Sequence, residues 1–288
     1  MDYTFILIIQ ALSSVAMLVL LSIGLAIMFG MMKVINFAHG EFLMIGAYTS
    51  VMSVNAGLNF WIATFFVAPL SVALVGFVVE RLIIRHLYGR LIETMLATWG
   101  LSLFLIGAVT LVFGNTVTGI SAPLGAVEIG SYSTSAYELL LIVLALFLLA
   151  ACAIFLKGTK AGLVARAAMQ NSDITAVLGH EPAKIYCATF VVGSAITGLA
   201  GGLIAPLTGV SPSMGLAFVA KAFITVICAG PAVITGTGLV ASTFGSINTA
   251  VTFLSTPVFG EVALLLSAIV LLRVMPRGFT AKFFRGSL

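Results

Sequence analysis

The chain has 288 residues, of which 61% are hydrophobic and only 8% are charged, and its net charge is +4. Soluble proteins carry about 25% charged residues because their surfaces face water, so this composition excludes a soluble enzyme and a nucleic-acid-binding protein. The mean hydropathy of +1.24 indicates an integral membrane protein, in which basic residues in the loops set the orientation.

Nine uncharged, apolar stretches follow one another along the chain, and each predicts a helix, because lipid offers no partner for free backbone groups. Several are shorter than the roughly 20 residues that cross a bilayer, so we expect some to be broken or re-entrant. We therefore predict an all-α polytopic membrane protein with eight or nine transmembrane helices in a single domain, residues 1–288. The stretches are 5–30, 42–54, 61–79, 95–113, 139–156, 185–207, 222–234, 239–254 and 262–272.

The distribution of lysine and arginine predicts how these helices are oriented. Of the 13 basic residues, all but Lys221 fall in alternate connections or in the C-terminal tail. The positive-inside rule makes that side cytoplasmic, which places the N-terminus outside and the C-terminus in the cytoplasm and requires an odd number of crossings. The opposite side holds a polar loop, 114–137, and the acidic residues Asp2, Glu128, Glu138 and Glu261. The basic residues on the cytoplasmic side are Lys33, Arg81, Arg85, Arg90, Lys157, Lys160, Arg166, Lys184, Arg273, Arg277, Lys282 and Arg285.

The connection after the first stretch holds Asn36, His39 and Glu41 at membrane depth or just inside it. Ionisable groups at that depth are costly and mark functional sites. In a second interpretation, Lys33 and Glu41 lie at the aqueous boundary and satisfy helix ends, where an acidic side chain favours the positive end of the helix dipole. Residue chemistry alone favours this second interpretation, because boundary charges are common.

Two weaker polar features lie further along the chain. Glu93, Thr98 and Trp99 lie near the inner end of a later stretch, although Trp99 is equally typical of an interfacial belt. Glycine and proline are frequent around Pro206 and again after Gly230. Such residues either interrupt helices whose backbone lines a substrate path or, more commonly, allow tight helix packing.

The connection 157–184 is too long and too patterned to be a simple turn. Thr159 suits a helix start, and a glycine and a proline near the end of the connection stop the helix. Arg166, Gln170 and Asp173 are spaced i, i+4 and i+7 and so share one face of this predicted cytoplasmic helix. Such a helix suits docking on a soluble partner or lying on the membrane surface, and its amphipathicity does not decide between them.

The sequence contains no motif for catalysis within the chain. It has no Gly-Lys-Ser or Gly-Lys-Thr phosphate loop and no His-Glu-x-x-His, and no nucleophile lies near a base. We therefore expect a transport protein that is not an enzyme and that holds no metal or cofactor of its own. The hypotheses are a transport subunit, a self-sufficient channel or secondary carrier for a small neutral solute, and an intramembrane enzyme that lacks its required groups.

Five motifs are spread in order along the whole chain. They are VINFAHGEF within 30–48, ETMLATWG at 93–100, the set Thr159, Gly162, Arg166 and Asn171, the run 194–202, and LRVMPRG at 272–278. Together they resemble the permease subunits of the branched-chain amino acid family of ABC importers. The second motif and the tail look closer to the urea and short-chain amide branch. One departure is Pro231, which stiffens the backbone where related permeases carry a Gly-Gly-x-Gly run.

The resemblance implies a multi-pass subunit of the bacterial inner membrane that forms the path for a small nitrogenous solute. It implies a second permease, with a heterodimer favoured over a homodimer, an extracytoplasmic solute-binding protein, and two cytoplasmic subunits that bind ATP and magnesium. Few polar groups lie in the apolar stretches, which favours urea or a short-chain amide, with a branched-chain amino acid as the alternative. The partners include the lipid bilayer and no nucleic acid.

The resemblance also implies roles for individual residues. The connection 157–184 matches the coupling loop of the family, so its helix is expected to dock on an ATPase subunit. The expected ATPase contacts are Gly162, Arg166, Gln170, Asn171 and Asp173. The candidates for the translocation path are Asn36, His39, Glu41, Glu93, Thr98, Trp99, Pro206 and Gly230.

Overall fold

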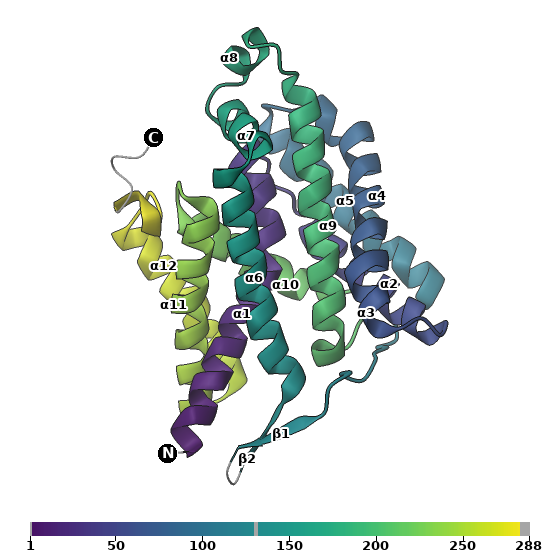
Figure 1. The fold of residues 1–288 in the computed structure, drawn as a ribbon, viewed down its shortest axis with the longest axis vertical. Coiled ribbons are helices and arrows are strands. Elements are labelled where there is room, and N and C mark those ends of the chain that lie inside the picture. Colours follow the sequence, from purple (N-terminus) through teal and green to yellow (C-terminus); the bar gives the residue numbers. More distant parts are fainter. Residues whose placement is uncertain (1, 130–131, 283–288) are drawn as a thin grey trace. The chain divides into compact units, whose positions relative to one another are not determined.

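The computed structural model describes residues 2–129 and 132–282, which are mostly helical (Figure 1). This confirms the predicted all-α class. Eight of the nine apolar stretches lie in uninterrupted helical segments, and the ninth, 222–234, contains the break between α10 and α11. The elements are α1 (Asp2–Met32), α2 (His39–Asn55), α3 (Phe60–Ile62), the π-helical η1 (Ala63–Val67), α4 (Ala68–Leu82), the 3₁₀ turn η2 (Ile84–Leu87), α5 (Leu91–Phe113), β1 (Ala126–Ile129), β2 (Tyr132–Ser135), α6 (Ala136–Gly158), α7 (Lys160–Gln170), α8 (Ser172–Val177), α9 (Pro182–Thr208), α10 (Met214–Ala229), α11 (Val233–Leu254), α12 (Pro257–Val274) and η3 (Phe279–Lys282).

Within the described residues, six helical segments are long and apolar enough to cross a membrane. A seventh is counted if α10 and α11, which are bent by 116° at their junction, form one broken span. Helix α2 has 17 residues, fewer than the roughly 20 that a full crossing needs. The eight or nine crossings expected from the sequence, and the orientation, stay predictions. The six segments are Thr4–Met32, Phe60–Leu82, Leu91–Phe113, Ala136–Gly158, Pro182–Thr208 and Pro257–Ala281.

The chain forms two compact units. Unit 1 comprises the described parts of 1–22, 122–153 and 221–288, and unit 2 comprises 23–121 and 154–220. In unit 1, the start of α1 and the β1–β2 hairpin lie at one end and η3 lies at the opposite end (Figure 1). The predicted orientation requires this arrangement, although Arg285 of the basic tail lies outside the described residues.

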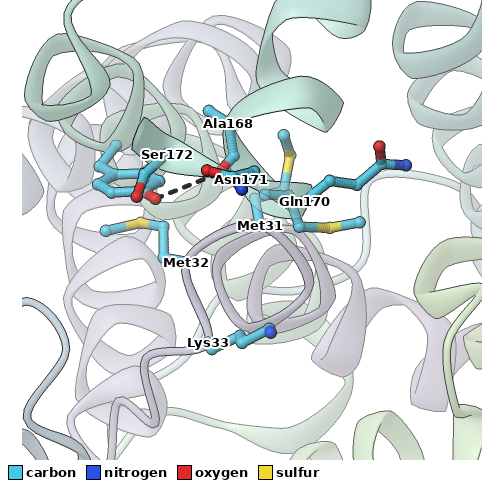
Figure 2. A pocket seen from close by; sticks show the side chains of 9 residues that line it. Met31, Met32, Lys33, Ala168, Gln170, Asn171 and Ser172 are labelled. Atoms are coloured by element: carbon cyan, nitrogen blue, oxygen red, sulfur yellow. Dashed lines mark hydrogen bonds between the residues drawn. The ribbon is translucent and has the colours of Figure 1, made fainter. Parts of the chain in front are cut away.

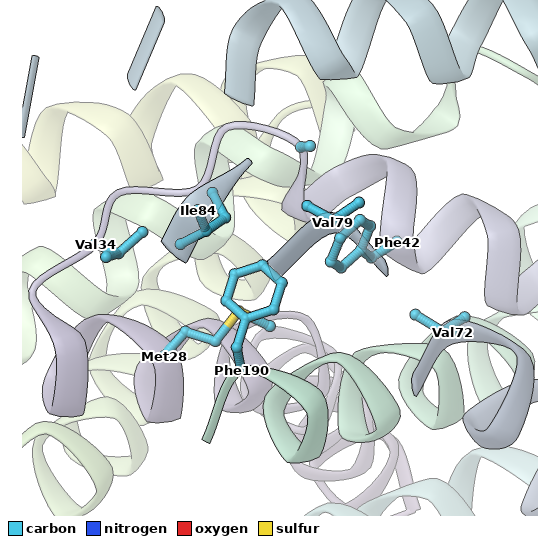
Figure 3. Packing of buried hydrophobic residues seen from close by; sticks show 8 residues of the cluster. Met28, Val34, Phe42, Val72, Val79, Ile84 and Phe190 are labelled. Carbon is cyan, nitrogen blue, oxygen red and sulfur yellow. The ribbon is translucent and has the colours of Figure 1, made fainter. Parts of the chain in front are cut away.

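The core of unit 2 is built by α2, α4 and α9. Phe42 of α2 meets Phe190 of α9 edge to face, with ring centroids 6.1 Å apart, and Met28, Val72 and other apolar side chains surround the pair (Figure 3). Burying such side chains contributes about 1.5–3 kcal/mol each in water. In a membrane, close packing takes over that role.

Glycine allows the backbones of α2 and α9 to touch. A Cβ on Gly46 would overlap the backbone carbonyl of Gly198, and a Cβ on Gly201 would overlap that of Leu43. The glycine-rich run that precedes Pro206 is therefore a packing surface, as the commoner interpretation of the sequence has it. Helix α9 continues through Pro206 and ends at Thr208.

In unit 1, the helices break before α11. Gly230 adopts a φ of +82°, and the chain resumes as a helix at Val233. Thr280 of η3 closes the gap: its hydroxyl donates to the Ala229 carbonyl at 2.6 Å and accepts from the Ala232 amide at 3.1 Å. Backbone groups freed by the break are thus satisfied within the protein, as membrane depth demands.

The polar loop 114–137 contains an element that the sequence did not reveal. Strands β1 and β2 form an antiparallel hairpin in which Ala126 pairs with Ser135 and Val127 with Thr134. Earlier in the loop, Thr118 forms a bridge with Val210, which follows α9. The hairpin is short, and its register is set by four residue pairs.

Candidate functional site

The connection between α1 and α2 is a buried turn built around Asn36. Lys33 leaves α1 with a φ of +53°, a left-handed conformation that is rare for residues other than glycine. The Asn36 side-chain oxygen accepts from the Ala38 amide at 3.1 Å, and its carbonyl accepts from the His39 amide at 3.1 Å. Asn36 is fully buried, so it starts α2 inside the protein rather than at the aqueous boundary.

Helix α5 fastens this turn from one side. The Phe37 amide donates to the Thr98 hydroxyl at 3.1 Å, and that hydroxyl donates to the Thr94 carbonyl at 2.8 Å. Thr98 therefore lies beside the connection that holds Asn36, His39 and Glu41, the polar residues that the sequence singles out there. Glu93 and Trp99, in contrast, lie on the exposed side of α5, and Trp99 is 57% exposed.

His39 and Glu41 lie on the first turn of α2 and are fully buried. The His39 Nδ1 atom lies 3.5 Å from the hydroxyl of Thr197 on α9. Neither carboxylate oxygen of Glu41 has a hydrogen-bond partner among the described residues. The Ser102 hydroxyl lies close to this carboxylate without reaching hydrogen-bonding geometry.

These positions decide between the two interpretations of the connection. The boundary interpretation fits Lys33, which is exposed, and it correctly places Glu41 at a helix start. It does not fit the burial of Glu41, and no side chain caps the start of α2. The start of α2 is therefore a buried polar cluster formed by Asn36, His39, Glu41, Thr98, Ser102 and Thr197.

Sequence reasoning missed Ser102 and Thr197. Thr94, Thr98 and Ser102 are spaced by four residues and are all buried on α5, so their helical periodicity was the signal for Ser102. Thr197 gave no such signal because it lies in a run of small residues that also suits packing. Of the other path candidates, Pro206 lies near the end of α9, and Gly230 belongs to unit 1.

The connection 157–184 folds differently from its prediction. Thr159 caps α7, accepting from the Gly162 amide at 3.0 Å, as the sequence indicates. The single predicted helix is wrong, however, because the chain breaks at Asn171, which adopts an extended conformation. The Asn171 side chain accepts from the amides of Asp173 and Ile174, both at 3.0 Å, and so starts α8.

The break separates the expected ATPase contacts. Arg166 and Gln170 lie on α7, whereas Asp173 lies on α8, so the continuous i, i+4, i+7 face does not form. Gly162 packs against the backbone of Leu156, where a Cβ would overlap the carbonyl. Leu163 on α7, Ile174 and Val177 on α8, and Leu178, which directly follows α8, are exposed apolar side chains.

Helix α7 is connected to the spans through Tyr186 of α9. The Tyr186 hydroxyl donates to the Ala168 carbonyl at 3.3 Å, and its ring packs edge to face on Tyr88 at 5.1 Å. Tyr88 donates to the buried carboxylate of Glu80 on α4 at 2.5 Å. Burial, together with Glu80, raises the pKa of the Tyr88 hydroxyl well above its ordinary value, so this donor stays protonated. The contacts lead from α7 to α9 and α4.

A pocket of about 310 Å³ lies between the end of α1 and the junction of α7 and α8 (Figure 2). Lys33 and the side chains around Asn171 supply its polar lining, and Met31 and Met32 supply apolar surface. No group of His, Cys, Asp and Glu side chains suited to a metal ion is found among the described residues.

The comparisons with known proteins agree on one family. The family model described as "Branched-chain amino acid transport system / permease component" matches residues 7–275. The chain belongs to this family. No solved structure matches it.

Curated members of the family match over most of their length. The high-affinity branched-chain amino acid transport system permease protein LivH of Escherichia coli (strain K12) is 29% identical over 91% of both chains. BraD of Pseudomonas aeruginosa is 30% identical over 79% of this chain and 81% of its own. A probable branched-chain amino acid transport permease, LivH of Methanocaldococcus jannaschii, is 25% identical over 90% of this chain and 84% of its own.

These matches confirm the family that the five motifs indicate. The preference for urea or a short-chain amide gains no support from them. The relatives named here are branched-chain amino acid permeases, so the alternative substrate fits better.

Proposed function

We propose that this chain is the membrane subunit of an ATP-driven importer and forms part of the path for a branched-chain amino acid. The observation that carries the proposal is the family match over residues 7–275. The chain has at least six helices suited to membrane spans in its described part. It also buries a polar cluster at the start of α2, as a path for a polar solute requires.

The partners follow from the proposal. An ATP-driven importer needs ATPase subunits, and this chain has no phosphate loop, so two cytoplasmic partner subunits would hold ATP and magnesium. A second permease would complete the path, with a heterodimer favoured, and an external solute-binding protein would deliver the substrate. The complex would lie in the bacterial inner membrane, which suits the apolar composition.

Helices α7 and α8 are the proposed ATPase contact. Leu163, Val177 and Leu178 are more than half exposed, and burying each against a partner would contribute about 1.5–3 kcal/mol. Gly162, Arg166, Gln170, Asn171 and Asp173 lie in the same segment. Asn171 has a structural task as the cap of α8, so its effect on docking would come through the position of that helix.

Movement of α7 would reach the spans through Tyr186. This residue is bonded to the Ala168 carbonyl and packed on Tyr88, which holds Glu80 of α4. When the ATPase subunits close on ATP, α9 and α4 would then shift together, and the path would open alternately to the two sides of the membrane. The proposed path residues are Asn36, His39, Glu41 and Thr98 of the buried polar cluster in unit 2. Glu93, Trp99 and Pro206 also lie in unit 2 but outside this cluster, and Gly230 lies in unit 1.

Affinity purification of the tagged chain from its native membrane tests the proposal. The expected result is co-purification of two ATPase subunits and a second permease, and a binding protein from the same system that binds leucine, isoleucine or valine. A binding protein that takes urea or an amide instead would overturn the substrate. A chain that purifies alone and carries solute without ATP would overturn the importer.

A further inference from the structure

Unit 2 buries two acidic side chains in contrasting environments. Glu80 is fully buried, and one of its oxygens accepts a hydrogen bond of 2.5 Å from Tyr88. Glu41 is also fully buried, yet both of its carboxylate oxygens lack a partner among the described residues. Burying a carboxylate is costly unless it is paired. Glu80 is paired through one oxygen, and its other oxygen has no partner among the described residues, whereas Glu41 is paired through neither.

No lysine or arginine among the described residues forms an ion pair with Glu41. The ion pairs there are Lys184–Glu181 and Lys221–Glu261, so no such cation lies within 4.0 Å of its carboxylate. Within the same polar cluster, the hydroxyls of Thr98 and Thr197 already donate to backbone carbonyls. A positive partner for the charged form of this carboxylate would therefore come from outside the described part of the chain.

The first turn of α2 does not account for Glu41 either. An acidic side chain at a helix start can cap backbone amides, but α2 has no side-chain cap, and the Glu41 oxygens bond to no amide. The residues that follow, Phe42, Leu43 and Met44, are fully buried and apolar. The Glu41 carboxyl group is thus buried between these apolar residues and the polar side chains of the cluster, and it has no hydrogen-bond partner among the described residues.

From this geometry we propose that Glu41 binds the ammonium group of the amino acid during its passage through unit 2. The inference rests on the proposed function and names how that substrate is recognised. A branched-chain amino acid brings the missing positive charge together with an apolar side chain, and an ammonium bound to a carboxylate forms strong charge-assisted hydrogen bonds. Urea has no formal charge and would not require the charge of Glu41.

The site is closed in this conformation. Gly40, one residue before Glu41, packs its backbone against Gly215 at the start of α10, where a Cβ on either residue would overlap the other chain segment. The ammonium can reach Glu41 only when the start of α2 separates from its neighbours. A carboxylate that is sealed in one state and exposed in another suits a path with alternating access.

The test is leucine uptake by the complete transporter in proteoliposomes, with the liganded binding protein at saturation and ATP inside. Glu41→Gln removes the charge and keeps the shape, and we expect uptake to fall by about tenfold or more, as for other buried charge partners. ATP hydrolysis stimulated by the binding protein should persist, because the ATPase contact is untouched. Glu41→Asp keeps the charge with a shorter reach and should retain an intermediate rate. Glu128→Gln makes the same change on the exposed strand β1 and should transport normally.

Each outcome decides the proposal. A Glu41→Gln transporter with the wild-type leucine rate would overturn it, as would loss of ATPase stimulation in parallel with uptake, which indicates a structural role. If Glu41→Gln fails to assemble, Glu41→Asp decides: an intermediate rate supports the proposal, and a wild-type rate or no transport contradicts it. Failure of the wild-type transporter to move leucine, with uptake of urea instead, would overturn the proposed substrate rather than the role of Glu41 alone.

Discussion

The helices are interrupted before α2 in unit 2 and before α11 in unit 1, and the two breaks differ in how their polar groups are bonded. Before α11, the free carbonyl of Ala229 and the free amide of Ala232 are both bonded to Thr280. Before α2, Asn36 and Thr98 bond the backbone, but the Glu41 carboxylate is buried with no partner in the part of the chain that the structure describes. Bonding the freed backbone groups within the protein makes the break before α11 a structural one, whereas a buried carboxyl group without a partner points to a ligand.

The largest expected effect comes from the packing at the break before α2. Gly40→Val would force a side chain into the backbone of Gly215. Because backbone cannot move aside as a flexible side chain can, the cost should exceed about 3 kcal/mol. We expect loss of folded protein in detergent, measured by size-exclusion chromatography. Gly57→Ala, with open space around Gly57 but a positive φ, is the milder control, and normal folding of Gly40→Val would contradict the packing.

The break before α11 should be the next most sensitive. Thr280→Val removes the hydroxyl and leaves one buried carbonyl and one amide unsatisfied, each at a cost of about 1–3 kcal/mol. The midpoint of thermal unfolding should fall clearly, whereas Thr280→Ser, which keeps the hydroxyl, should restore most of it. If the transporter carries leucine normally once folded, the break is structural, as the comparison requires. A stable Thr280→Val protein that fails in transport would assign this break to the path.

The corresponding change before α2 should alter both stability and transport. Thr98→Val removes the acceptor of the Phe37 amide, which we expect to cost about 1–3 kcal/mol and to lower leucine uptake because the start of α2 shifts. Thr98→Ser is the matched control for the hydroxyl. Uptake per folded transporter is the deciding quantity, and an unchanged value would separate Thr98 from the path.

The smallest effect on stability is expected in α7. Arg166→Glu reverses a charge that makes no hydrogen bond through its buried Nε atom, so unfolding should shift little, whereas co-purification of the ATPase should be lost. Lys160→Glu makes the same reversal at the exposed start of α7 and should bind the ATPase better than Arg166→Glu. Unchanged ATPase binding in Arg166→Glu would remove this residue from the contact.

The sequence predicts the helices well because long apolar stretches have one stable form in lipid. It predicts the 157–184 segment less well, because Asn171 fits the middle of a helical pattern as a polar residue and also caps a new helix. The hairpin of β1 and β2 depends on pairing between two strands within a polar loop, which hydropathy does not reveal. The burial of Glu41 depends on α5 and on Gly215, which are far from it in sequence, so charge alone favoured the boundary interpretation.

The central claim is that this permease carries a branched-chain amino acid under the control of ATP. The most direct measurement is uptake of labelled leucine and labelled urea into proteoliposomes containing the complete transporter, with and without ATP. The account predicts leucine accumulation that requires ATP and the binding protein, and no accumulation of urea. Uptake of urea in place of leucine, or leucine flux of equal size without ATP, would contradict it.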